Sequence, residues 1–587
     1  RRRGGEEGER EEERARTPVE ELLAGIWAEV LGLDQAGIHD DFFILGGHSL
    51  MATQVISRIN EAFNITLPLR ALFDLPTVSE LAGAVEAEMS LGPAVQRPPI
   101  EPAPRDGQLP LSFAQQRMWV FDQLVPGSDV YNVPFAVRLS GSLDVDAFER
   151  TFNEVIRRHE SLRTTFATEG GRPVQIVAER LEMGIPLVDL SGLLQPEQTA
   201  EARRIAARHN HRPFDLIKGP LIRVCIVRLS ELEHVALVNM HHIISDGWSI
   251  GVLHREIVIL YEAFAAGLPS PLKDPVIQYP DYAVWERLWL QGEVLEAQLS
   301  YWKARLSGAP PVLDLPTDRP RPATQTFNGA SISRHLPRPS LDALREVSRR
   351  NGVTLFMTLL AAFDALLHYH TGRTDIIVGV DIANRGRVEV EDLIGFFANQ
   401  LALRVDLSGD PAFTDIQKRA RETALGAYAN QDVSFDKLIE VLKPVRIPGR
   451  SPLFQVKLVH QNSRKSELSI SSLKTARFES DVDVAKFDLL LNVIEGEEGL
   501  INTLFYNKDL FDKGRVERML AQYDTILLAA VAQPESRLSA LMEILADAER
   551  QQQMTEREEF KDARRRMLKD LKSRAVKAPR AKGEVGL

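Results

Sequence analysis

The chain has 587 residues, a formal net charge of −11, a hydrophobic share of 44% and a charged share of 26%. This length exceeds what one hydrophobic core supports, so we expect two to four domains of ordinary globular composition. The negative charge argues against a nucleic-acid partner. The sequence contains no run of eighteen apolar residues, so no membrane span is predicted. The single cysteine, Cys225, excludes an intramolecular disulfide and favours a cytoplasmic location.

Both ends of the chain differ in composition from the rest. Residues 1–16 contain six arginines and six glutamates with almost nothing apolar, which predicts a disordered leader. The chain lacks an initiator methionine and a signal-peptide core, so we interpret it as a fragment of a larger protein. Residues 549–587 form a basic tail. Its apolar residues are spaced like one face of a short helix, and they are Phe560, Ala563, Met567 and Leu571. A linker toward a downstream domain is the favoured interpretation, and a docking segment for a partner subunit is the alternative.

Ordered structure is expected to begin at Thr17, a plausible N-cap followed by proline and by Glu20. Further on, DDFFILGGHSLMATQVISRINEAF places Ser49 at the N-terminus of a second amphipathic helix. Free backbone N–H groups and the positive end of the helix dipole would favour a phosphate esterified to the Ser49 hydroxyl. The alternative is that Ser49 is only a helix cap. A G-x-S-x-G nucleophile elbow is not present, because Met51 stands where the second glycine would be.

A larger α/β unit follows a proline-rich linker at residues 90–108. Short apolar runs predict strands, and they read FAVRL, IRVCIVRL, VALVNM, DIIVGV, FQVKLV and INTLFY. Helical patterns occupy residues 144–159, 341–350 and 354–369. More than 400 residues of this kind predict two lobes. Cys225 lies within one apolar run and is expected to be a buried strand residue.

Residues 240–249, MHHIISDGWS, are the strongest candidate for a site. They follow a run typical of a buried strand and precede a helical pattern at residues 250–266. A strand-to-helix junction allows one histidine to face a cleft while Asp246 turns inward to hold the loop. Adjacent strand residues point to opposite faces, so His241 and His242 cannot easily share an ion, and we expect no metal. The alternative is one core histidine and one surface histidine.

Two resemblances to a known family cover nearly the whole chain. The helical unit at residues 17–89, with DDFFILGGHSL, resembles the peptidyl carrier protein of nonribosomal peptide synthetases. That resemblance implies 4'-phosphopantetheine on Ser49. The larger unit resembles the condensation domain of the same synthetases, through seven motifs in the family's order: LSFAQQRMW, RHESLRTTF, MHHIISDGWS, YPDYAVW, IGFFANQLALR, NQDVSFD and RSPLFQV.

The second resemblance implies two chloramphenicol-acetyltransferase-like lobes, at residues 109–275 and 276–548. It also implies an active site in a tunnel between the lobes, entered by one carrier arm from each side. The expected reaction joins an acyl or peptidyl thioester to an acceptor amine, usually an aminoacyl thioester on a downstream carrier, as an amide. An α-amino group with a pKa of about 7.7–8.0 is neutral in about one molecule in ten at pH 7, so no strong base is required.

The resemblance also implies roles for single residues. We expect His242 to position the amine and to be able to accept its proton, and His241 to serve packing. Asp246 would be structural and pair with Arg385, and Gly247 would let the loop backbone approach the reacting carbonyl. Trp248, Ser249 and Asn399 are candidates for lining the site, with packing or capping as the alternative.

Several related functions stay open from the sequence. An epimerisation domain shares the HHxxxDG signature, although the ordered motifs favour condensation, and a heterocyclisation domain would carry aspartate in place of the histidine pair. An ester-forming variant and a non-catalytic recruitment domain are the remaining alternatives. The expected partners are an upstream adenylation domain, a downstream acceptor carrier and a phosphopantetheinyl transferase, in antibiotic or siderophore biosynthesis. The sequence contains no adenylation motif, so it does not reveal which amino acids the reaction would join.

Overall fold

The structure, a computed structural model, describes residues 17–90, 97–461, 470, 473–478, 484–551, 554 and 561. The predicted leader at 1–16 lies outside the described residues, as do residues 91–96 of the linker and nearly all of the basic tail, including the helical face from Phe560 to Leu571.

The carrier is a small helical domain, as predicted. Its helices are α2 (Pro18–Leu31), α3 (Ser49–Phe63), α4 (Leu69–Asp74) and α5 (Val78–Ser90). The predicted start at Thr17 is confirmed, because its hydroxyl accepts a 3.1 Å bond from the Glu20 amide and its amide donates to the Glu20 carboxylate. Trp27 and Phe42 are fully buried and meet edge to face, which fixes the long loop before α3 against the core.

The first lobe is built on a five-stranded sheet. Its strands are, in spatial order, β12 (Lys474–Arg477), β2 (Asn132–Ser140), β7 (Glu233–His241), β6 (Ile222–Ser230) and β5 (Leu187–Asp189). Helices α7 (Val145–Arg158) and α9 (Gly247–Ala265) pack together in this lobe, and α8 (Glu197–His211) contacts β2 and β7. Cys225 is buried in β6, as predicted. A separate small sheet contains, in spatial order, β1 (Leu109–Pro110), β4 (Arg172–Val177) and β3 (Thr164–Glu169).

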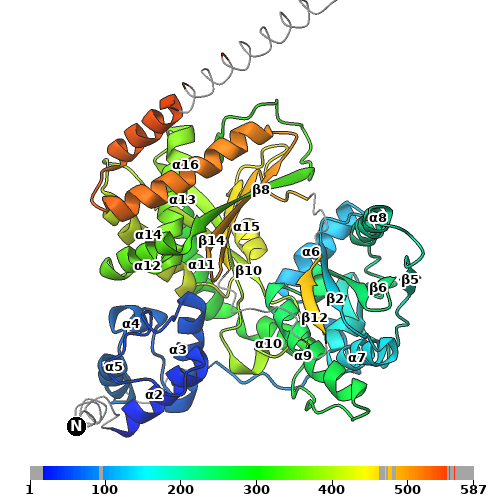
Figure 1. Cartoon of the computed structure of the whole chain (residues 1–587). Helices are drawn as coiled ribbons and strands as arrows, with labels where there is room; N and C mark the ends of the chain where they lie inside the picture. Colours follow the sequence, from blue (N-terminus) through cyan, green and yellow to red (C-terminus); the bar gives the residue numbers. More distant parts are fainter. Residues whose placement is uncertain are drawn as a thin grey trace, which may run out of the picture.

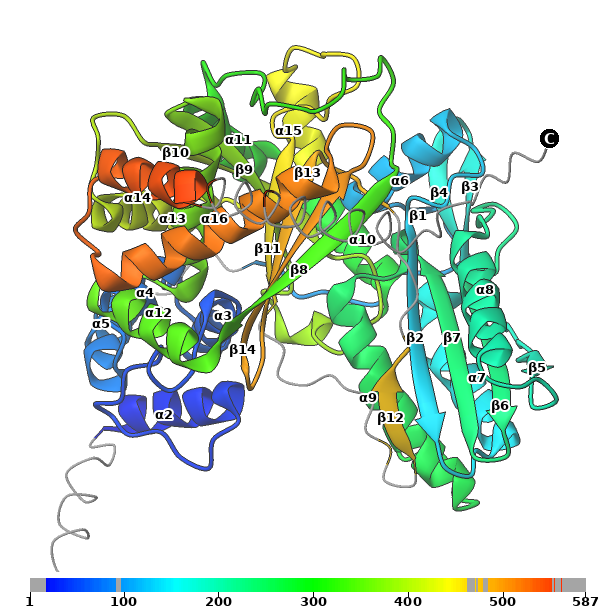
Figure 2. The ribbon, with the colours of Figure 1, turned by 45° about the horizontal axis from the view of Figure 1, so that its top comes forward.

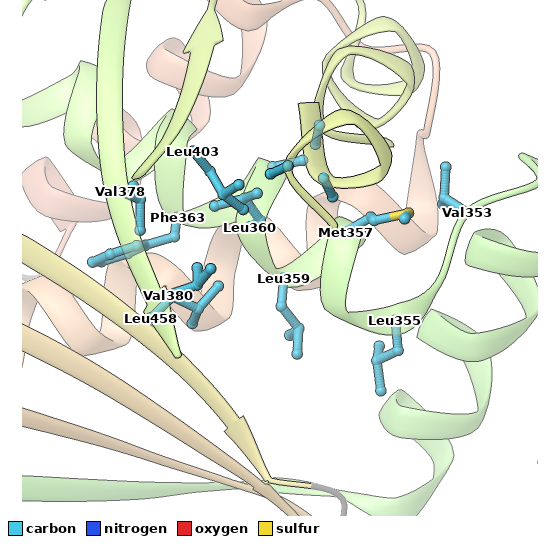
Figure 3. Packing of buried hydrophobic residues seen from close by; sticks show 14 of the residues in the cluster. Val353, Leu355, Met357, Leu359, Leu360, Phe363, Val378, Val380, Leu403 and Leu458 are labelled. Carbon is cyan, nitrogen blue, oxygen red and sulfur yellow. The ribbon is translucent and has the colours of Figure 1, made fainter. Parts of the chain in front are cut away.

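The second lobe is built on a mixed six-stranded sheet. Its order is β10 (Asn399–Asp406), β9 (Asp375–Ile382), β11 (Val456–Gln461), β13 (Leu489–Glu495), β14 (Gly499–Asn507) and β8 (Gly329–Pro337). Strand β11 is parallel to both neighbours, and the other pairs are antiparallel. Figure 3 shows how α13 (Leu355–Thr371) packs Leu359, Leu360 and Phe363 near Val378, Val380 and Leu458 of the sheet.

The remaining helices cover the second lobe or join it to the first. They are α6 (Phe113–Leu124), α10 (Tyr279–Trp289), α11 (Gly292–Leu306), α12 (Arg338–Arg350), α14 (Phe413–Ala429), α15 (Phe435–Leu442) and α16 (Lys513–Ala532). The two sheets lie side by side, and the carrier contacts the second lobe beside α12 and α14 (Figures 1 and 2). The buried apolar residues of the carrier and of the second lobe form one continuous cluster.

One strand departs from the simple division of the chain into lobes. Strand β12 lies within the range predicted for the second lobe, yet residues Lys474–Arg477 pair with β2 of the first lobe (Figure 1). The chain therefore returns to the first sheet before it enters β13. The boundary between residues 275 and 276 stays a prediction, but the assignment of all of 276–548 to one lobe is corrected for this strand. A four-residue strand with little apolar character gives no pattern that sequence reasoning could detect.

The described part of the predicted linker runs along the condensation unit and is fastened to it. The Arg97 guanidinium contacts Asp432 at 2.8 Å, and the Arg105 guanidinium contacts Asp281 at 2.6 Å. The Trp285 indole donates to the Pro98 carbonyl at 2.7 Å. These contacts fix the end of the linker, so the carrier is attached at a defined point.

The hydrophobic helices of the described residues are short or interrupted by charges. No single helix there is long and apolar enough to cross a bilayer, and only the bent pair α12 and α13 passes when the two are counted together.

Candidate active site

A cavity of about 2270 Å³ lies between the lobes and reaches the carrier. Its lining includes Ser49 of the carrier, His242, Gly247 and Trp248 of the first lobe, and Asn399 of the second. Pockets for one small ligand measure roughly 300–1000 Å³. The space therefore admits two substrates, and it joins the predicted attachment serine to the predicted histidine.

His242 is the first residue of a 3-10 turn, η2 (His242–Ile244), directly after strand β7. Its Nδ1 lies 2.7 Å from the Ser245 carbonyl oxygen. Because a carbonyl only accepts, Nδ1 carries the proton and Nε2 keeps its lone pair. Burial lowers the His242 pKa to about 4, and the Lys486 ammonium acts in the same direction. His242 is thus a neutral hydrogen-bond acceptor at pH 7.

His241 lies away from the cavity, as expected for a packing residue. Its side chain is buried, and its Nδ1 accepts a 3.1 Å bond from the Ile243 amide. Burial lowers the pKa of His241 to about 3, with the His242 ring contributing in the same direction. His241 therefore fixes the turn that presents His242.

Asp246 is the N-cap of α9 and the centre of a buried network between the lobes. One carboxylate oxygen accepts from the Ser249 amide at 2.8 Å and from the Arg385 guanidinium at 3.2 Å. The other accepts from the Phe397 amide at 3.0 Å. The expected Asp246–Arg385 pair is present, with side chains 2% and 0% exposed. Burial lowers the pKa of Arg385, while Asp246 acts in the opposite direction.

Arg385 bonds several further acceptors, whereas its Nε makes no hydrogen bond within the described residues. It donates to the Val390 and Leu393 carbonyls at 2.6 and 2.7 Å and to the Ser249 hydroxyl at 2.9 Å. Its guanidinium also lies 4.1 Å from the ring centroid of Phe397. A buried ion pair is stable only when such additional bonds compensate desolvation.

The three candidates for lining the site differ in position. Trp248 lines the cavity, and its indole N–H donates to the Glu391 carbonyl at 2.7 Å. Asn399 also borders the cavity, but its amide is committed to the backbone of residues 431–435. Ser249 is fully buried and is not among the cavity-lining residues, because its hydroxyl bonds Asp246, Arg385 and Gly395. Ser249 therefore bonds the buried Asp246–Arg385 pair and does not line the cavity.

Gly247 begins α9 and faces open space. A Cβ placed there meets no protein atom within 4 Å, and the residue lines the cavity. A side chain at this position would project into the volume available to substrates.

Several of the sequence motifs converge behind the histidine loop. The Gln115 side-chain amide donates to the Ile243 carbonyl at 3.1 Å, so LSFAQQRMW supports the turn after His242. The Tyr279 hydroxyl donates to the Phe396 carbonyl at 2.6 Å and lies 2.8 Å from the Ser112 hydroxyl. Phe396 in turn places its ring 4.9 Å from the His242 ring. The motifs therefore hold one loop in place from several elements.

A basic group in the cavity was missed by sequence reasoning. Lys457 contacts Asp381 at 2.6 Å, and Arg117 donates to Gln400 at 3.1 Å. Lys486 lies with its ammonium 4.8 Å from the Tyr131 ring centroid, and burial together with Lys457 lowers its pKa to about 8. Only Arg117 stood inside a recognised motif, LSFAQQRMW. Lys457 stands in the apolar run FQVKLV and Lys486 in a connection, and neither sequence context indicates that the fold brings these lysines to the cavity that His242 lines.

Ser49 is the first residue of α3, after the N-cap His48, as predicted. Its hydroxyl oxygen is buried and makes no hydrogen bond of good geometry within the described residues. The Tyr428 side chain on α14 is the neighbour of this hydroxyl. Burial raises the pKa of Tyr428, and the Ser49 hydroxyl partly offsets that rise. Ser49 thus stands at the start of a fifteen-residue helix and lines the cavity that His242 also lines, a position that fits phosphopantetheine attachment.

Ion pairs seat the carrier on the second lobe. The Arg58 guanidinium binds both carboxylate oxygens of Glu391 at 3.2 and 3.0 Å, and Gln54 donates to Glu391 at 2.8 Å. A second bidentate pair joins Arg70 to Glu422 at 2.9 and 3.1 Å. Both pairs have the parallel geometry that gives arginine contacts orientation as well as affinity.

Within the described ranges, no group of three or more histidine, cysteine, aspartate or glutamate side chains could hold an ion.

Comparison with protein families identifies both units. Residues 105–554 match the condensation domain family, and residues 21–85 match the phosphopantetheine attachment site family. The first match covers more than half of the chain, so the chain belongs to the condensation domain family, preceded by a carrier domain. Its relatives include synthases and synthetases, one of them named as a tripeptide synthetase.

Three relatives illustrate this. The chain is 48% identical over 539 residues to one of the linear gramicidin synthase proteins of Brevibacillus parabrevis, covering 92% of this chain and 7% of that protein. It is 42% identical over 533 residues to malpibaldin synthetase of Mortierella alpina, covering 90% and 10%. It is 38% identical over 513 residues to phosphinothricin tripeptide synthetase of Streptomyces viridochromogenes, covering 87% and 43%. The chain thus spans a small part of the first two relatives.

Solved structures agree on the fold. The X-domain in complex with OxyB from teicoplanin biosynthesis matches with a TM-score of 0.69 and 28% identity, covering 76% of this chain and 98% of that one. The first condensation domain of the calcium-dependent antibiotic synthetase matches with a TM-score of 0.61 and 20% identity, covering 74% and 99%. The predicted carrier and two-lobed condensation architecture is therefore confirmed.

The buried pair between the lobes leads to a stability prediction. Asp246→Ala leaves the Arg385 charge buried and unpaired, so we expect the free energy of unfolding to fall by about 3 kcal/mol or more. Asp392→Ala is the matched control, because Asp392 pairs with Arg255 on the surface and its loss should cost less than about 1 kcal/mol. Urea denaturation of both variants measures the difference. Equal stability of Asp246→Ala and the parent chain would contradict a structural role for the pair.

Proposed function

We propose that this chain holds a donor acyl or peptidyl group on Ser49 and joins it to an acceptor amine at His242, forming an amide. The observation that carries this proposal is the single cavity that opens on both residues. When attached to Ser49, phosphopantetheine would supply a thiol that carries the acyl group as a thioester, and formation of the amide C–N bond would break the C–S bond and return the thiol, with the proton that the amine loses. The carrier, linker and cavity of this chain then restrict where the acyl carbonyl can go.

His242 acts by positioning the amine. Its Nε2 lone pair is free because Nδ1 donates to Ser245, so it can accept a hydrogen bond from the attacking nitrogen. With an imidazole pKa of about 4, transfer of a proton from an ammonium of pKa about 7.7–8.0 would cost about 5 kcal/mol. Alignment of reactants can contribute more than a base this weak. Gly247 leaves the space beside His242 open for the reacting carbonyl.

The proposed partners follow from the two ends of the reaction. An upstream adenylation domain supplies the donor, a downstream carrier supplies the acceptor, and a phosphopantetheinyl transferase modifies Ser49. The acidic chain with one buried cysteine supports a cytoplasmic location. The class of product, an antibiotic or siderophore peptide, belongs to the same proposal.

A non-catalytic recruitment role is the second candidate. It is favoured by one similar structure, an X-domain described in complex with OxyB. Against it, this chain keeps a neutral His242 facing the cavity, an open Gly247 and a docked carrier with Ser49 on the same cavity. Formation of an amide by the purified chain would separate the two roles.

Attachment at Ser49 has a direct test. Incubation with coenzyme A and a phosphopantetheinyl transferase should add one phosphopantetheine mass to the intact chain, as measured by mass spectrometry. Ser49→Ala should abolish the addition, and Ser90→Ala, at the end of α5, should not. An addition that persists in Ser49→Ala would disprove the assignment.

The role of His242 can be separated into positioning and proton transfer. His242→Ala should slow amide formation by about 100-fold in single-turnover assays with a loaded carrier, because alignment is lost. His242→Gln should keep part of the rate, since its amide oxygen accepts a hydrogen bond but takes no proton at neutral pH. An unchanged rate in His242→Ala would contradict both roles, and equal loss in both variants would favour a base.

The low pKa of His242 predicts the pH dependence. The imidazole stays neutral down to about pH 4, so below about pH 7 the rise of kcat/KM should follow the acceptor amine as it loses its proton. Loss of the Lys486 proton near pH 8 would add a step that is the same for every acceptor. Two acceptor amines of different pKa should therefore shift the profile by the difference between their pKa values. A fixed break near pH 6.5 with both amines would show that an ordinary histidine titrates instead.

A further inference from the structure

Glu391 contacts the carrier through its side chain. It follows the 3-10 turn η3 (Val388–Val390) and binds Arg58 and Gln54, which both lie on α3, the helix that begins at Ser49. The Arg58 and Glu391 side chains are each 15% exposed, whereas those of the Arg70–Glu422 pair are 53% and 52% exposed. The Glu391 contact is therefore the shielded part of the docking surface, where water and salt screen least.

The main chain of the same residue contacts the active-site loop. The Glu391 carbonyl accepts the Trp248 indole N–H at 2.7 Å, and Trp248 follows Asp246 and Gly247 in the first turn of α9. Glu391 thus bonds the carrier with its carboxylate and the histidine loop with its carbonyl.

The residues beside Glu391 reinforce this link. Val390 and Leu393 accept from Arg385, which pairs with Asp246. The Gly395 amide donates to the Ser249 hydroxyl at 3.1 Å, and that hydroxyl donates to the Gly395 carbonyl at 2.8 Å. The segment at 390–395 is therefore bonded to α9 at several points, and a shift of Glu391 is transmitted to the loop that bears His242.

We propose that Glu391 is a positioning residue that couples docking of the carrier, through Arg58 and Gln54, to the conformation of the His242 loop. A docked carrier orders the loop, and a departed carrier releases it. The consequence for rate rests on the function proposed above, whereas the coupling itself is a property of the fold and can be measured without any reaction.

Hydrogen exchange tests the coupling in the full chain. We expect Arg58→Ala and Glu391→Ala to speed amide exchange at residues 243–250 by about tenfold. Arg70→Ala and Glu422→Ala, which break the Arg70–Glu422 pair, should retain that protection, because Glu422 on α14 bonds Arg70 and Arg421 rather than the loop. Glu391→Gln should restore protection, since its amide oxygen can still accept from Arg58 and Gln54. Unchanged exchange in both Arg58→Ala and Glu391→Ala, or equal acceleration in Arg70→Ala, would overturn the proposal.

The Trp248 bond supplies a second, independent readout. In a Trp248→Phe background, which removes the indole N–H, Arg58→Ala should speed exchange at residues 243–250 by less than it does in the parent chain, because the Ser249–Gly395 bonds still join the segment to α9. In single turnovers, Arg58→Ala should lower the rate at saturating acceptor several-fold more than Arg70→Ala, with the acceptor KM unchanged. Additive exchange effects would refute the route through Trp248. A parent chain that forms no amide would refute the proposed function while the exchange result still decides the coupling.

Discussion

The buried pair of Asp246 and Arg385 holds the two lobes in the arrangement on which the site depends. Both charges are buried, and further contacts are needed to compensate desolvation of this size. Two backbone carbonyls, the Ser249 hydroxyl, the Phe397 amide and the face of the Phe397 ring provide those contacts. Because the partners come from different lobes, the pair fixes the register between them, and the cavity that joins Ser49 to His242 follows from that register.

The environment of His242 determines whether this residue can act as a base or as a hydrogen-bond acceptor. Burial and the nearby Lys486 ammonium lower its pKa and so its affinity for a proton, while the Ser245 carbonyl fixes the tautomer. A histidine whose pKa is lowered in this way keeps its Nε2 lone pair as a directed hydrogen-bond acceptor over the whole physiological pH range. This is sufficient for an amine nucleophile, whose own deprotonation at pH 7 costs only about 1 kcal/mol.

The carrier is held twice, by its docking surface and by a linker fastened to the condensation unit. Arg97 and Arg105 anchor the linker on Asp432 and Asp281, and Arg58 and Arg70 dock the helices. Such attachment raises the effective concentration of the donor at the cavity without any new contact to the reacting atoms. The same docking surface touches the segment that supports the histidine loop, so delivery and positioning share one set of residues.

The sequence by itself determined the local structure and the chemical parts. Apolar runs predicted strands β2, β6, β7, β9, β11 and β14, the capping pattern at Thr17 predicted the start of α2, and Ser49 and His242 were found within their motifs. These features depend on residues a few positions apart, whose periodicity and capping chemistry are readable. The Asp246–Arg385 pair was reached only through family resemblance, because 139 positions separate its members. Tertiary structure alone determined where strand β12 pairs, where the cavity lysines lie and which two partners Glu391 contacts. Their partners are distant in the chain, and only packing of the lobes and carrier brings these charges and hydrogen-bonding groups together.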